Sequence, residues 1–137
     1  MAPVIGASVM SDAMARRGRG HIVLVGSISE SFPLPMAPTY AATKAGLALY
    51  AEALGIRMAA HGVAVTLVSP GFIDTPMSQQ LTEPRPFLMS ADRAAQIIIA
   101  KLATRPARIV LPWQFIVIRA ASRLMPRALM RLILRRA

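Results

Sequence analysis

The chain has 137 residues, a length that suits one domain, and it is strongly basic, with a net charge of +10. All six acidic residues lie at or before Asp92, together with six basic ones, so the ten basic residues from Arg93 onward have no acidic neighbours in sequence. Cysteine is absent, which excludes disulfides and thiolate metal sites and fits a reducing compartment such as the cytoplasm. The two histidines are isolated, so no metal site is expected, and the longest apolar run, 109–118, is too short to span a bilayer.

The first 60 residues predict a helix, a buried strand, a loop and a second helix. Residues 2–17 have helical composition, and the basic residues and glycines of 16–20 are typical of a helix end. The apolar run 21–25 predicts a strand buried on both faces, with Ser27 just beyond its carboxyl end. Three prolines make 29–38 a loop, after which Thr39 is expected to cap a helix that extends to about Ala60.

The second half repeats the alternation of strand and helix. Residues 63–68 predict a strand, 72–89 an irregular segment, 91–104 a helix capped by Ser90, and 107–111 a third strand. Strands separated by helices require parallel crossovers, so the sequence predicts an α/β fold, a partial Rossmann-like three-layer sandwich with parallel strands. In such sheets the chemistry gathers beyond the carboxyl ends of the strands.

Tyr40 and Lys44 are the first candidates for a catalytic role. Their spacing of four places both side chains on one face of the predicted helix. A nearby ammonium favours the phenolate form of a tyrosine, which can then give or take a proton near neutral pH. Ser27, at the end of the preceding strand, could hydrogen-bond the same substrate oxygen. Alone, this spacing is equally compatible with a surface pair.

Three motifs in order resemble the short-chain dehydrogenase/reductase family. Residues 26–29 read Gly-Ser-Ile-Ser, 40–44 read Tyr-Ala-Ala-Thr-Lys, and 70–75 contain a Pro-Gly turn followed by a threonine. The serine precedes the tyrosine by thirteen positions, a separation that the family favours. The resemblance covers about residues 1–111 and corresponds to the C-terminal half of the family's Rossmann-type domain, with 112–137 as a separate basic tail.

The resemblance implies an oxidoreductase that transfers a hydride between NAD or NADP and a small carbonyl or alcohol substrate. Tyr40 would be the general acid/base, Lys44 would bind the nicotinamide ribose, and Ser27 would orient the substrate oxygen, with Ser29 as a less well spaced alternative. The nicotinamide end of the cofactor would be contacted by residues of the turn after the second strand: Pro70, Gly71, Ile73 and Thr75.

The sequence also departs from the family's pattern. Gly26 stands where a serine is common, Glu30 where a glycine is common, and Thr43 where a serine is usual. The Gly-rich dinucleotide fingerprint is missing, so the nucleotide-binding strands would precede Met1. Without them the strand 22–25 would keep an unpaired edge, and the isolated chain is expected to be inactive.

Substrate and partners are less well defined. The apolar residues Met77, Leu81, Phe87, Leu88 and Met89 either indicate a hydrophobic substrate or merely pack on the body. A face of small residues at Ala41, Ala45 and Ala48 is compatible with the homo-oligomers that full-length relatives form.

The tail combines arginines at every fourth position with apolar residues, and Pro126 would divide it into two short helices. The arginines are Arg119, Arg123, Arg127, Arg131 and Arg135. Such a tail packs on the protein or on another subunit, or it lies on an anionic membrane surface. The low aromatic content argues against nucleic acid. A non-catalytic interaction or peripheral membrane module therefore remains the alternative to an enzyme.

Overall fold

The computed structural model describes residues 2–80 and 84–134, and its centre is a sheet of three parallel strands. These are β1 (Gly20–Val25), β2 (Val63–Pro70) and β5 (Arg108–Leu111), in the order β1-β2-β5. Within the described residues β1 pairs with β2 alone, so its other edge is open, as the sequence predicted. All three strands are parallel, as crossover helices require.

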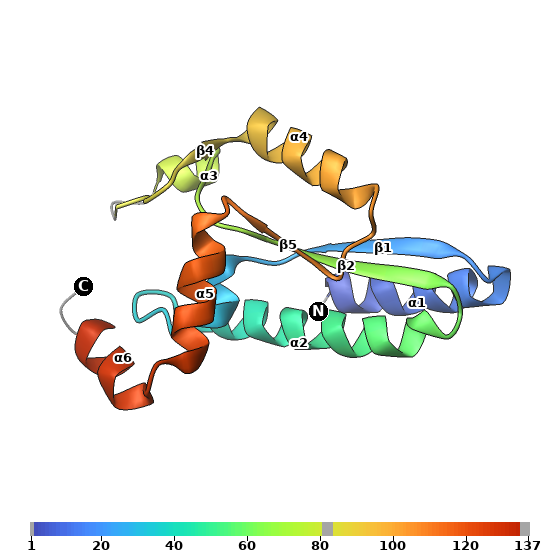
Figure 1. Cartoon of the computed structure of the whole chain (residues 1–137), viewed down its shortest axis with the longest axis horizontal. Helices are drawn as coiled ribbons and strands as arrows, with labels where there is room; N and C mark the ends of the chain where they lie inside the picture. Colours follow the sequence, from blue (N-terminus) through green and yellow to red (C-terminus); the bar gives the residue numbers. More distant parts are fainter. Residues whose placement is uncertain (1, 81–83, 135–137) are drawn as a thin grey trace.

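Helices cover both faces of this sheet, which makes three layers (Figure 1). On one face α1 (Ala2–Arg17) packs on β1 and α2 (Pro38–Ala59) packs on β2. On the other face lies α4 (Ala91–Leu102), which contacts β5. The predicted α/β class with parallel strands is confirmed.

The core follows from the alternation of side chains along the strands. Ile22 and Leu24 of β1 point into the cluster under α1 and α2, while Val23 and Val25 point to the opposite face and are exposed. The buried residues of α2 recur at helical spacing and fill the same cluster: Leu47, Ala48, Ala51, Leu54 and Met58. A second, smaller cluster joins β5 to α4 through Ile109, Leu111 and Ala94.

Residues 72–89 contain more regular structure than the sequence indicated. Two short strands, β3 (Ile73–Asp74) and β4 (Met89–Ser90), pair in parallel and enclose the one-turn helix α3 (Pro76–Gln79). The sequence did not predict these elements for two reasons. Three prolines in the segment favour a loop, and a two-residue strand is too short to show an alternating pattern. Met77, Phe87 and Leu88 are exposed, and Leu81 lies outside the described residues.

Helix starts were predicted with mixed success. The Ser90 hydroxyl accepts a hydrogen bond from Arg93 N at 3.3 Å and so caps α4, which confirms that prediction. The prediction for α2 was wrong: Ala37 occupies its cap position, Pro38 is its first residue, and no side chain caps it. Proline is favoured at the first helical position because its fixed φ is helical and it has no N–H to satisfy.

The C-terminal tail forms two helices, α5 (Gln114–Leu124) and α6 (Arg127–Leu134), separated at Pro126 as predicted. Arg135 lies outside the described residues. None of the described helices has both the length and the apolar character required to cross a membrane.

A buried polar chain ties the first strand to the segment before the last one. His21 Nε2 lies 2.8 Å from Thr66 Oγ1, and Thr66 Oγ1 donates to the carbonyl of Pro106 at 2.5 Å. Because the threonine has one hydrogen and gives it to Pro106, its oxygen accepts from the Nε2–H of His21. Partial burial, and secondarily the positive charge of Arg105, lower the pKa of His21.

This lowered pKa predicts a loss of stability on acidification. Between the lowered folded pKa and the ordinary value of 6.5, the unfolded chain binds more protons, so stability falls as pH drops through this window. We expect Tm to fall between about pH 7.5 and pH 5.5, on either side of the reference value, and to fall less in His21→Gln. His61→Gln, which changes the chain's other and exposed histidine, is the control. Equal pH dependence in all three proteins would contradict the prediction.

Candidate active site

The carboxyl ends of β1 and β2 lie side by side and form the floor of the candidate site. Gly26 N donates to the carbonyl of Val68 at 2.7 Å, which continues the parallel register for one residue beyond β1. Ser27 therefore lies next to the end of β2 and the Pro70–Gly71 turn. Strand residues that are 43 positions apart in sequence thus pair where a doubly wound sheet binds its ligands.

Tyr40 and Lys44 are brought together in the first turns of α2. The Lys44 ammonium lies 5.6 Å from the centre of the Tyr40 ring, and it donates to the carbonyl of Val25 at 3.3 Å. This second contact fixes the lysine against the last residue of β1, two positions before Ser27. The tyrosine side chain remains 46% exposed, so its hydroxyl is accessible to a ligand.

Ser27 and Ser29 differ in a way that distinguishes their chemistry. Ser27 is partly exposed, and its Oγ accepts the Ser29 N–H at 3.2 Å, which caps the short helix η1 (Ile28–Ser31). The acceptance leaves the hydroxyl hydrogen of Ser27 free to be donated to another group. Ser29 is 5% exposed, and its buried Oγ has no partner among the described residues. Of the two candidate serines, Ser27 is therefore the more accessible one.

Residues of the turn after β2, which are expected to contact the cofactor, are also engaged in contacts within the protein. Gly71 N donates to the carbonyl of Leu111 at 2.7 Å, and an added Cβ at Gly71 would overlap the ring of Phe115 from α5. Thr75 Oγ1 accepts from Ser78 N at 3.3 Å and so caps α3. Pro70 ends β2 and Ile73 packs against the β5–α4 cluster.

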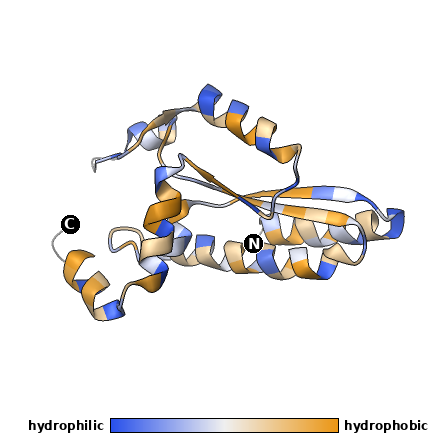
Figure 2. Cartoon of the chain, in the orientation of Figure 1, coloured by the Kyte–Doolittle hydropathy of each residue, from blue (hydrophilic) through white to orange (hydrophobic). Residues whose placement is uncertain are grey.

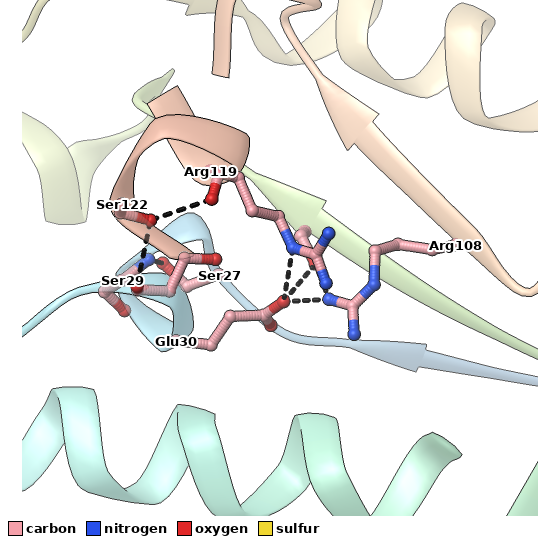
Figure 3. A network of polar contacts seen from close by, with 8 residues as sticks. Ser27, Ser29, Glu30, Arg108, Arg119 and Ser122 are labelled. Carbon is pink, nitrogen blue, oxygen red and sulfur yellow. Dashed lines mark hydrogen bonds and ion pairs between the residues drawn. The ribbon is translucent and has the colours of Figure 1, made fainter. Parts of the chain in front are cut away.

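A buried carboxylate beside these residues was missed by sequence reasoning (Figure 3). The Glu30 side chain is 3% exposed and forms an ion pair with Arg108 of β5, with Arg119 of α5 4.0 Å away. Ser69 at the end of β2 also donates to the carboxylate at 3.1 Å. Burial, and secondarily the charges of Arg119 and Arg123, lower the pKa of Arg108 to about 10, so it stays protonated at neutral pH. We call Glu30, Ser69, Arg108 and Arg119 the Glu30 cluster.

The Glu30 cluster accounts for two departures from the family's pattern together. A Cβ at position 26 would lie 3.1 Å from Glu30 Oε2, which is closer than such atoms normally approach. The same Cβ would lie 3.1 Å from Leu67 Cδ1, so Gly26 avoids crowding against both the Glu30 carboxylate and the Leu67 side chain. In the sequence this appears as a paired change. Gly26 stands where a serine is common, and Glu30, four residues later, stands where a glycine is common.

The same region is held by the tail. Ser122 of α5 donates to the carbonyl of Ser31 at 3.1 Å, and Arg119 reaches the Glu30 carboxylate from the same helix. Figure 3 shows α5 lying directly over the turn that contains Ser27 and Ser29. The end of the chain thus supports the turn that presents the candidate serine. Among the described residues no three acidic or histidine side chains form a group that could hold a metal ion.

Comparison with known proteins agrees with this geometry. The sequence profile of the family described as short chain dehydrogenase matches residues 1–86, which include all the motifs noted above. The chain therefore belongs to the short-chain dehydrogenase family.

Individual proteins are similar to this chain in sequence or in fold. An uncharacterised oxidoreductase of Myxococcus xanthus is 30% identical over 122 residues, which are 89% of this chain and 48% of that protein. The fold matches a short-chain dehydrogenase from Streptomyces avermitilis with a TM-score of 0.75 at 23% identity, covering 88% of this chain and 52% of that one. It also matches a short-chain dehydrogenase from Sphingobium yanoikuyae in complex with NADPH, with a TM-score of 0.69 at 22% identity, covering 78% and 43%. The chain spans about half or less of the curated relatives it matches.

Proposed function

We propose that this chain carries the proton-transfer half of an NAD(P)-dependent oxidoreductase that acts on a small carbonyl or alcohol. The observation that carries the proposal is the position of Lys44, which lies between the Tyr40 ring and the carbonyl of Val25, two residues before Ser27. These contacts support the proposal that Ser27, Tyr40 and Lys44 act on one substrate oxygen beyond the end of β1.

The chemistry assigned to this chain is proton transfer and orientation. In the direction of reduction, the Tyr40 hydroxyl gives its proton to the substrate oxygen, and in oxidation it takes the proton back. Ser27 donates its free hydroxyl hydrogen to the same oxygen and so orients it. A bound nicotinamide would supply or accept the hydride.

The residues present fit such a cofactor in part. Lys44 has three N–H donors and uses one on Val25, so two remain for ribose hydroxyls beside Tyr40. Pro70, Gly71, Ile73 and Thr75 are proposed to contact the nicotinamide end. For Gly71 this contact would be through atoms other than its N–H, which is bonded to Leu111. The Thr75 hydroxyl caps α3 as an acceptor, so its hydrogen remains free to be donated.

We further propose that the nucleotide-binding part of the enzyme lies outside these 137 residues, so that residues 1–111 are half of a Rossmann-type domain and 112–137 a tail. The open edge of β1 and the exposed Val23 and Val25 on its outer face support this proposal, since both would be covered by further strands and helices. The proposed location is cytoplasmic, and a homo-oligomer of the complete enzyme is expected. A hydrophobic substrate is supported by the exposed Met77, Phe87 and Leu88.

Two proteins test the proposal. One is the 137-residue chain, and the other, called the fused chain, has the part of the Myxococcus xanthus relative that precedes the matched region placed before residue 2. Oxidation of NADH and NADPH is followed with a panel of aliphatic and aromatic ketones. We expect turnover by the fused chain and none by the 137-residue chain. Turnover by the short chain would refute the proposed division, and a fused chain that binds NADPH but reduces no carbonyl would refute the oxidoreductase.

A further inference from the structure

The tail helix α5 turns Arg119 and Ser122 toward the protein beside the buried Phe115 ring, and it turns several of its other apolar residues toward solvent. Phe115, Arg119 and Ser122 recur at helical spacing on the inner side, where they contact Gly71, Glu30 and Ser31. A surface helix normally has the opposite arrangement, with its apolar stripe toward the core. The Glu30 cluster therefore fixes α5 in an orientation that turns its apolar side outward.

The outer side of α5 is a continuous apolar stripe. Four apolar residues fall within about 60° of one line along the helix, given its 3.6-residue turn. They are Trp113, Ile116, Val117 and Leu124, and all are at least 50% exposed. Scattered exposed apolar residues are normal on proteins, but a contiguous stripe with an indole at one end marks an interaction surface.

Helix α6 follows α5 in the chain and has an exposed apolar side of its own. None of its residues is buried. At helical spacing the exposed Leu129, Leu132 and Ile133 share one side, and Arg127 and Arg131 fall on the other. Figure 2 shows that α6 contains both hydrophobic and hydrophilic residues. An eight-residue helix is not stable in water on its own, so its apolar side requires a partner. We call the outer stripe of α5 and the apolar side of α6 the tail surface.

The charge of the tail identifies the chemistry of that partner. Arg123, Arg127 and Arg131 are exposed around the tail surface, and no acid follows Asp92 in the sequence. Two copies of this tail would repel each other, which argues against a contact between identical surfaces. Trp113 is the one exposed aromatic residue among the described tail residues, whereas nucleic acid needs several stacking platforms.

We propose that the tail surface binds an anionic lipid bilayer, with α5 and α6 lying in its interface. Aliphatic side chains and an indole enter the boundary between headgroups and acyl chains, while arginines at the rim contact the negative headgroups. The inference goes beyond the proposed oxidoreductase activity and does not depend on it, because the contact uses none of Ser27, Tyr40 and Lys44.

The test uses the 137-residue chain with vesicles of phosphatidylcholine, alone or mixed with phosphatidylserine. Trp113 is the only tryptophan, so its fluorescence reports directly on the tail surface. We expect co-sedimentation and a shift of emission to shorter wavelength with the anionic vesicles, weakening as salt is raised, and neither effect with phosphatidylcholine alone.

Three variants make the test specific. Arg127→Glu with Arg131→Glu is expected to weaken binding to anionic vesicles by at least about tenfold, since each basic residue near an anionic surface contributes to affinity. The matched control, Arg16→Glu with Arg17→Glu at the exposed end of α1, changes the net charge equally and should weaken binding far less. Leu129→Ser with Ile133→Ser should abolish the fluorescence shift while circular dichroism keeps the signal of the folded body.

Four results would overturn the proposal. The first is equal binding to both kinds of vesicle, and the second is an equal loss in the α1 and α6 charge variants. The third is a sedimentation experiment in which the Leu129 and Ile133 substitutions convert a dimer to a monomer without affecting vesicles, since a second copy would then be the partner. The fourth is binding to duplex DNA without binding to anionic vesicles.

Discussion

Replacing Tyr40 with phenylalanine is expected to lower the kcat of the fused chain by about 10² to 10⁴, the usual contribution of a positioned general acid/base. The substitution removes one oxygen from a side chain that is 46% exposed, so the fold and the position of Lys44 should be unchanged. Because the proton transfer occurs only in the transition state, kcat and kcat/KM should fall together while KM stays nearly constant.

Tyr50 provides a matched control for this experiment. It is the other tyrosine of the chain, lies on the same helix, and donates its hydroxyl to the carbonyl of Val4 at 3.2 Å. Tyr50→Phe should reduce the free energy of unfolding by about 1 kcal/mol through the lost hydrogen bond and leave kcat unaffected. If Tyr40→Phe keeps most of its turnover, or if Tyr50→Phe loses as much, Tyr40 is not the acid/base.

The second large effect concerns Glu30. Glu30→Gln should reduce the free energy of unfolding of the 137-residue chain by about 3 kcal/mol, because it leaves Arg108 and Arg119 without the carboxylate that neutralises them. The Glu30 side chain is 3% exposed, so water cannot replace the lost charge. Urea unfolding followed by circular dichroism measures the change.

The same substitution at an exposed site separates burial from charge. Glu52 is an exposed residue of α2. Burial and the charge of Arg123 lower the pKa of Arg119, and the negative charge of Glu52 only partly opposes that shift. Glu52→Gln should therefore reduce stability by no more than about 1 kcal/mol, the range for exposed pairs. If Glu30→Gln and Glu52→Gln reduced the free energy of unfolding equally, the loss would come from the change in net charge and not from the buried cluster.

The parts of the fold that the sequence predicted are those with local patterns. The apolar runs 21–25 and 63–68 coincide with β1 and β2. Burial on both faces, which such runs predict, holds for β2, but Val23 and Val25 of β1 are exposed on one face. Tyr40 and Lys44 meet because a spacing of four is enough to bring side chains together on a helix. The proposed roles of these residues and of Ser27 stay predictions until kinetic measurements are made.

The parts that could not be predicted depend on contacts between distant residues. Residues 30, 69, 108 and 119 form one cluster. The local sequence around each of these four residues shows no pattern that predicts the cluster. Arg119 belongs to the regular series of tail arginines, yet it points inward while Arg123 is exposed. The periodicity of the tail therefore identified a helix with a basic side but not the orientation of that helix on the body.

The attachment of α5 has a practical consequence for anyone who shortens this protein. A chain that stops at Leu111 lacks three contacts of α5 with the body. These are the Phe115 ring beside Gly71, the Arg119 guanidinium near the Glu30 carboxylate, and the hydrogen bond from the Ser122 hydroxyl to the Ser31 carbonyl. Trimming the tail would thus disturb the turn next to Ser27 as well as remove the outward apolar side chains. Loss of activity in such a deletion would say nothing about lipids, and only substitutions restricted to the outer side can separate the two roles of this helix.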